Sequence, residues 1–108
     1  MIDEYELVTL IDHLEADALR RWIELGWIYP HQQVGGGARF DPSDVVRVRL
    51  ICELHYELSI EEDSMSVVLS LMDQLYAVRR SMRMLVAAIE AEPDDVRARI
   101  ARQVAGQR

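Results

Sequence analysis

The 108-residue chain has one cysteine, no lysine and no apolar run that approaches membrane-spanning length. Because Cys52 is the sole cysteine, no disulfide framework can form within one chain, and a reducing cytoplasm is the natural setting. Asp3, Glu4 and Glu6 stand where a basic leader would begin, so we expect no signal peptide. A transmembrane helix needs about 20 apolar residues, and we therefore expect a soluble, cytoplasmic protein. The use of arginine for every basic residue indicates no particular function.

The residue patterns of enzymes are also missing. His13, His31 and His55 are dispersed, and no pair of carboxylates is framed by a recognisable loop. The run Gly35-Gly36-Gly37 lacks a following Lys-Ser/Thr and a βαβ context, so it does not predict nucleotide binding. Cys52 and His55 could share one helix face, but the sequence has no second pair of metal ligands. We therefore predict no catalytic activity, no cofactor and no metal.

The longest regular pattern extends from about Glu61 to Ile89. Apolar residues recur there at alternating steps of three and four, without Gly or Pro, which is typical of a helix that packs against a partner helix. Such a helix would span roughly 40 Å at ~1.5 Å per residue, more than so small a protein can easily cover. We expect it to pair two chains, with packing inside its own subunit as the alternative. The predicted dimerisation residues are Val68, Leu71, Leu75, Val78, Met82, Leu85 and Ile89.

The first 60 residues have the pattern of a helix-turn-helix followed by a wing. A short apolar helix precedes a second helix that opens at Glu15 and ends at Gly26, a residue type that commonly follows a helix. Two extended segments around the glycine run predict a β-hairpin. Asp41 and Pro42 then start a third helix that runs to about Leu58. We expect a domain at 1–60, a long coiled-coil-type helix at 61–91 and a short C-terminal helix or tail at 92–108.

Three segments carry a family resemblance: the run Leu19-Arg20-Arg21-Trp22-Ile23-Glu24-Leu25-Gly26-Trp27-Ile28-Tyr29-Pro30, the run Ala38-Arg39-Phe40-Asp41, and the run Leu69-Ser70-Leu71-Met72-Asp73-Gln74-Leu75. With the order of elements, they resemble the MerR superfamily and, within it, the CbpM-like chaperone-modulator branch, over roughly residues 5 to 90. The resemblance implies a mainly α fold, a MerR-like winged helix-turn-helix with a small β-hairpin wing followed by a long dimerisation helix. It also implies a non-enzymatic protein that binds the J-domain of a DnaJ-like (CbpA-type) co-chaperone and inhibits its cooperation with Hsp70.

The chain departs from the DNA-binding members that it resembles. Those regulators usually carry a Tyr-Tyr-Glu run after the arginine of the second helix, whereas this chain has Arg21-Trp22-Ile23, and its first helix looks shortened. Their effector-sensing cysteines at the end of the long helix are absent from this sequence. The alternative function is nevertheless a MerR-family transcriptional regulator that binds operator DNA as a dimer. Its DNA contacts would be Arg20, Arg21, Arg39 and Arg47.

Charge favours the protein partner over DNA. Residues 1–58 contain eleven Asp or Glu and five Arg, a balance of −6 within a chain total of −7. A DNA-binding protein gains affinity by neutralising phosphates, so an acidic DNA-binding domain would repel the duplex. We expect the arginines to form salt bridges with neighbours such as Asp17, Glu24, Asp44 and Glu53. An acidic surface suits a basic protein, and the resemblance implies that the J-domain helix contacting Hsp70 is basic.

The acidic residues that could bind this partner lie at the helix-turn-helix corner, at the start of the third helix, and along its end and the following turn. Acidic residues of this kind more often belong simply to a solvated face. Trp27 is a further candidate because Trp is enriched at binding hot spots, whereas the spacing of Trp22 indicates a core position. The predicted partner-binding residues are Asp12, Glu15, Asp17, Trp27, Asp41, Asp44, Glu57, Glu61, Glu62 and Asp63.

Overall fold

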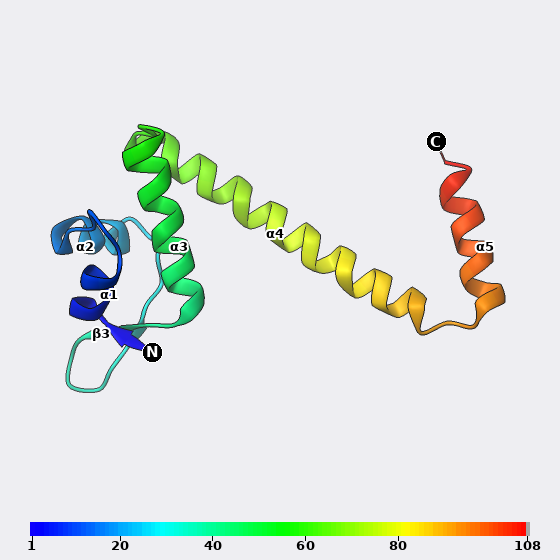
Figure 1. The fold of residues 1–108 in the computed structure, drawn as a ribbon, viewed down its shortest axis with the longest axis horizontal. Coiled ribbons are helices and arrows are strands. Elements are labelled where there is room, and N and C mark those ends of the chain that lie inside the picture. The colour runs from blue at the N-terminus through cyan, green and yellow to red at the C-terminus, as the bar shows by residue number, and fades with distance from the viewer. Residues whose placement is uncertain (108) are drawn as a thin grey trace. The chain divides into compact units, whose positions relative to one another are not determined.

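The structure, a computed structural model, describes residues 1–107 and divides into two compact units, Met1–Leu69 and a second that begins at Ser70. Their elements are drawn in Figure 1. In chain order they are β1 (Ile2–Asp3), α1 (Glu4–Leu10), α2 (Ala16–Glu24), β2 (His31–Gln32), β3 (Ala38–Phe40), α3 (Pro42–Cys52), the π-helical segment η1 (Glu53–Glu57), α4 (Glu62–Glu90) and α5 (Asp94–Ala105). The predicted fold class, mainly helical with a small hairpin and a long helix, is confirmed.

Local hydrogen bonds fix the ends of the first two helices. Asp3 caps α1, because its carboxylate accepts the Glu6 N–H at 2.8 Å while the Glu6 carboxylate accepts the Asp3 N–H at 3.4 Å. After α2, Gly26 adopts φ +76° and its N–H donates to the Ile23 carbonyl, while the Trp27 N–H donates to the Trp22 carbonyl. These two bonds form a Schellman motif, which confirms the predicted helix end.

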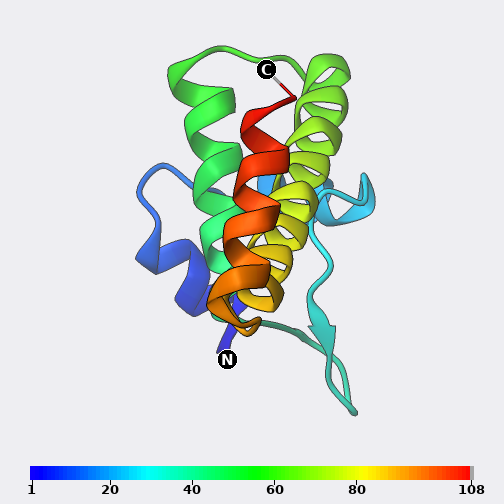
Figure 2. The ribbon, with the colours of Figure 1, turned by 90° about the vertical axis from the view of Figure 1, so that its right-hand side faces the viewer.

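The wing is part of a three-stranded antiparallel sheet in the order β1-β3-β2. Arg39 of the central strand lies opposite Asp3 on one side and His31 on the other. The predicted hairpin is present, and its loop protrudes from the first unit (Figures 1 and 2) with Gly35, Gly36 and Gly37 all at positive φ. Strand β1 was not predicted, because two residues carry no periodic pattern.

The third helix differs from the prediction in its last turn. Asp41 and Pro42 start it as expected, but regular α-helical bonding ends at Cys52, and Glu53–Glu57 is π-helical. The Leu58 N–H donates to the Glu53 carbonyl at 3.2 Å, an i to i+5 bond. Hydrophobic periodicity cannot register such a widened turn, since five residues are too few to distinguish the two helix types.

The core of the first unit forms between α1–α3, the sheet and the start of α4. The spacing argument for Trp22 is confirmed, because only 5% of this residue is exposed. Met65 and Leu69 carry the first turns of α4 into the same core. The side chains with the least exposure are Leu7, Leu19, Ile28, Phe40, Val48, Ile51 and Met65.

The second unit contains the later turns of α4 and helix α5. Among its described residues, 70–107, no side chain is buried. The apolar seam of α4 is therefore largely exposed, with Leu75 at 47% and Met82 at 60%. Within residues 1–107, no helix combines the length and the apolar character needed to cross a bilayer.

Candidate functional site

Arg20 is the first of two arginines on the exposed face of α2, the helix that reads DNA in a helix-turn-helix protein. Its guanidinium Nη2 lies 2.9 Å from the Glu4 carboxylate of α1, and Nη1 lies 3.7 Å from the Asp17 carboxylate one turn earlier. The pairing with Asp17 was predicted. One positive charge therefore stands between two negative charges.

Arg21 repeats this arrangement toward the other end of the helix. Its Nη2 lies 2.7 Å from Glu62 Oε1 at the start of α4, and its Nη1 lies 3.9 Å from Glu24 Oε2. The pairing with Glu24 was also predicted. Exposed ion pairs of this kind add about 0–1 kcal/mol each to stability, so their importance here is electrostatic: both arginines of α2 are outnumbered by acidic neighbours.

The other two candidate DNA contacts are tied into the fold. Arg39 lies half-buried in the central strand β3, and Arg47 of α3 is half-buried with its Nε–H donating to the Trp27 carbonyl. The Trp27 indole is 5% exposed and donates its Nε1–H to the Ser66 hydroxyl at 3.0 Å. It also stacks on Trp22 with ring centroids 6.3 Å apart. Trp27 therefore belongs to the core, and its side chain is not part of the exposed surface.

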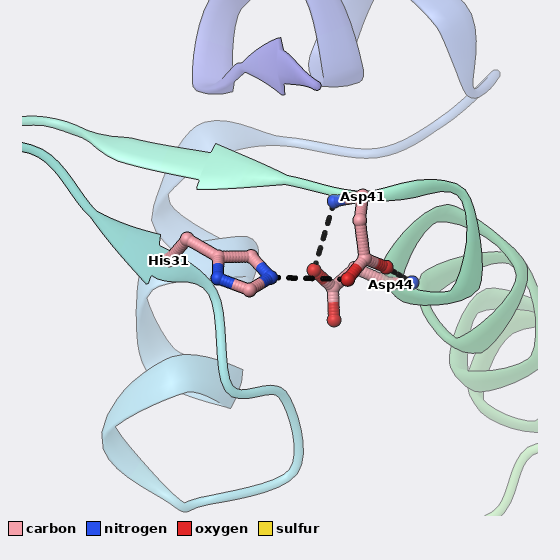
Figure 3. Close-up of side chains that lie close together, drawn as sticks. All are labelled: His31, Asp41 and Asp44. Atoms are coloured by element: carbon pink, nitrogen blue, oxygen red, sulfur yellow. Dashed lines mark hydrogen bonds and ion pairs between the residues drawn. The ribbon is translucent and has the colours of Figure 1, made fainter.

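Asp41 and Asp44 cap α3 and meet His31 of the wing (Figure 3). Asp41 Oδ1 accepts the Asp44 N–H at 2.9 Å and the Ser43 hydroxyl at 2.6 Å, and Asp41 Oδ2 lies 3.0 Å from His31 Nε2. In return, the Asp44 carboxylate accepts the Asp41 N–H at 2.9 Å. The Ser43 hydroxyl, the Asp44 amide and His31 hold the pKa of Asp41 well below its usual range.

The same three side chains bring oxygen and imidazole atoms within 4.8 Å of one another, and in residues 1–107 they form the one group with metal-ligand chemistry. Their contacts are those of a helix cap, however, because the carboxylates accept the first amides of α3. The positive end of the helix dipole also disfavours a cation at this point. The geometry is therefore explained by capping and by the contact between Asp41 and His31, which ties the wing to α3.

A second cluster surrounds a cavity of about 420 Å³ between the α1–α2 turn and the end of α3. We call it the acidic groove. It contains the carboxylates of Asp12, Glu53 and Glu57 and the guanidinium of Arg49. Its remaining lining residues are Leu10, Ile11, His13, Cys52 and Tyr56. Two of the predicted partner-binding residues, Asp12 and Glu57, thus share one cavity.

The family description "MerR HTH family regulatory protein", that of the MerR_2 family, matches residues 5–86. The chain belongs to this MerR family. Neither a curated protein nor a solved structure matches it significantly. MerR-family helix-turn-helix proteins are typically non-enzymatic regulators or binding proteins. The family therefore accounts for the helix-turn-helix and the wing, while the specific partner depends on the surface of this chain.

The remaining predicted acids of this MerR-family chain are spread over the first unit. Glu15 occupies the N-cap position of α2 without a side-chain capping bond, and Glu61 and Asp63 are exposed at the start of α4. Asp17 and Glu62 are engaged by the arginines of α2. The acidic groove therefore brings together acids from two of the three predicted places, the helix-turn-helix corner and the end of the third helix, while the start of the third helix lies apart from it.

Sequence reasoning did not assign His13, Arg49 or Tyr56 to this groove. Glu53 and Glu57 lie four residues apart, which indicates a shared helix face. No comparable signal placed the α1–α2 turn opposite that face, because the contact joins segments about 40 residues apart. His13 at φ 67° is a further feature that only the folded chain reveals.

Proposed function

We propose that this MerR-family protein is a chaperone modulator that binds the J-domain of a DnaJ-like co-chaperone and inhibits the cooperation of that co-chaperone with Hsp70. The observation that supports the proposal most directly is the pairing of Arg20 and Arg21 with four carboxylates. A reading helix enters the major groove between two rows of phosphates. The α2 face of this chain would bring more negative than positive charge into that groove.

The net charge of residues 1–58 also favours a basic protein over DNA as the partner. Residues 1–58 carry a balance of −6 from eleven acids and five arginines. Such a domain repels phosphates and attracts a basic surface at long range, so encounter with a basic protein is accelerated and becomes dependent on salt. The J-domain is the basic partner implied by the chaperone-modulator resemblance.

The second candidate is a transcriptional regulator, and the description of the matching family as regulatory proteins favours it. In this alternative, Arg20 and Arg21 would exchange their carboxylate partners for DNA phosphates. Both side chains are more than half exposed, so this exchange is sterically open. The two functions differ in the sign of charge that the first unit must recognise.

We also propose that the protein acts as a homodimer through α4. The seam of this helix exposes five large apolar residues: Leu71, Leu75, Val78, Met82 and Leu85. Removing apolar surface from water is favourable by about 25 cal/mol per Å², so pairing of this seam would stabilise a dimer. The same seam on a second copy supplies a matching apolar surface, as symmetric dimers require. A dimer would present two acidic first units.

Paired binding measurements test the proposed function. The purified protein is titrated with the purified J-domain of a DnaJ-like co-chaperone from the same genome, and J-domain stimulation of Hsp70 ATPase activity is followed in parallel. We expect saturable binding and loss of stimulation as the protein is added. A J-domain that neither binds nor loses its stimulation of the ATPase would overturn the proposal.

A further inference from the structure

The acidic groove has an excess of negative charge in a confined space. Asp12 comes from the α1–α2 turn, whereas Glu53 and Glu57 come from η1. Arg49 is the one guanidinium among the lining residues. Three carboxylates around one cation leave a net negative cavity that favours a further positive charge.

Tyr56 gives the groove an aromatic wall. Its ring centroid lies 4.8 Å from that of His55 and 6.5 Å from that of Trp22, so neighbouring aromatic side chains hold the ring in place. It is nevertheless 45% exposed. An exposed tyrosine face attracts a cation, and the attraction is stronger where the cation is partly desolvated. A tyrosine ring together with carboxylates therefore suits the binding of an arginine or lysine side chain.

The inner lining of the groove is apolar and chemically inert. Ile11 and Cys52 are buried, and burial, with a smaller effect from Glu53, raises the pKa of the Cys52 thiol to about 11. The thiol therefore stays neutral at physiological pH and does not act as a nucleophile. This apolar lining strengthens the electrostatic attraction of the rim carboxylates, because screening by water is weaker there.

A small-molecule ligand fits the groove less well than a charged side chain does. Small-molecule pockets are lined predominantly by apolar and aromatic residues with few polar groups. Four of the nine lining residues here are charged. The chemistry matches the end of a long basic side chain, whose apolar stem covers Tyr56 and Leu10 while its cation meets the carboxylates.

We propose that the acidic groove receives an arginine or lysine side chain of a basic partner protein, held between Asp12 and Glu57 against the ring of Tyr56. The inference rests on the proposed function and identifies where on the first unit the J-domain would be held. It gives opposite roles to two kinds of lining residue. The carboxylates attract the incoming side chain, and Arg49 repels it.

Charge variants of the full chain test the proposal by titration with the J-domain. Asp12→Asn and Glu57→Gln are each expected to weaken binding about three- to tenfold, since each removes one attracting charge. Arg49→Gln is expected to tighten binding about two- to fivefold, an effect that mere loss of structure would not produce. Asp95→Asn on α5 is the matched control and should leave affinity within about twofold.

Tyr56 variants separate the aromatic contact from packing. Tyr56→Phe keeps the ring and should retain binding, whereas Tyr56→Leu keeps apolar bulk and should weaken binding about fivefold. Circular dichroism and thermal melts of every variant confirm that the fold is retained. Unchanged affinity in Asp12→Asn, Glu57→Gln and Arg49→Gln, with normal binding by the wild type, would overturn the groove while leaving the proposed function intact.

Failure of the wild type to bind the J-domain would count against the proposed function, and the groove then has its own probe. A hexa-arginine peptide is titrated into the ¹⁵N-labelled protein and followed by NMR. Shifts centred on Asp12, Tyr56 and Glu57 that disappear in the Asp12→Asn variant support the groove. Shifts spread over other acidic surfaces, or unchanged in that variant, contradict it.

Discussion

Asp41 joins α3 to strand β2 of the wing through one carboxylate. It caps α3, accepts the Ser43 hydroxyl and pairs with His31 of the wing, and these contacts favour its ionised form in the folded chain. The lowered pKa of Asp41 means that its contribution to stability is complete above the ordinary Asp value of about 3.9 and is lost as pH falls from there through the folded value.

We therefore expect Asp41→Asn to lower the urea midpoint of unfolding at pH 7, and the difference from wild type to narrow between pH 5 and pH 3. Asparagine is a good N-cap, so the substitution mainly removes the charge. Equilibrium urea unfolding at pH 7, 5 and 3 measures the difference. A gap that stays constant or widens on acidification would show that the charged contacts do not stabilise this junction.

Gly26 ends α2 with a positive φ, so the effect of adding a side chain there depends on backbone conformation. At φ +76° an added Cβ would meet only the Tyr29 hydroxyl at 3.5 Å, so the cost of a side chain is conformational rather than a clash. We expect Gly26→Ala to reduce the free energy of unfolding by about 1–2 kcal/mol. Chemical denaturation tests this, with Gly106→Ala at φ −72° as the control that should be near neutral. Equal effects in the two variants would contradict the explanation.

Among the secondary-structure elements, most helix ends could be predicted from residues close by in the sequence. The pairing of distant segments could not be predicted in this way. Asp41 with Pro42 and Gly26 mark boundaries through interactions within a few residues, and the structure confirms both. Strand β1 exists because it pairs with β3 across the sheet, and η1 depends on a widened turn. Neither leaves a periodic signal in the sequence.

The seam of α4 is the element whose role can be tested by a single substitution. We expect Leu75→Glu or Met82→Glu to convert a dimer into a monomer, because a carboxylate would be buried without a partner in the apolar seam. Light scattering coupled to size-exclusion chromatography measures the mass. Ala87→Glu, on the opposite side of the same helix, should leave the dimer intact. An unchanged mass in both seam variants would rule out this use of α4.

At the scale of the whole molecule, the sequence predicted the sign of the surface charge better than its arrangement. The balance of −6 over residues 1–58 and the pairs Arg20–Asp17 and Arg21–Glu24 followed from composition and helical spacing. The partners Glu4 and Glu62 come from other helices, and the acidic groove joins two distant segments. Trp27 was misjudged as a surface candidate because its indole packs inward and bonds to Ser66.

We propose that this winged helix-turn-helix protein recognises a cationic protein in place of nucleic acid. The most direct measurement titrates one labelled sample of the protein with the J-domain and, separately, with duplex DNA from upstream of its own gene, both at about 0.15 M salt. We expect saturable J-domain binding that weakens as salt rises, with no sequence-selective binding of DNA. Selective DNA binding under these conditions, together with no retention of the J-domain, would contradict it.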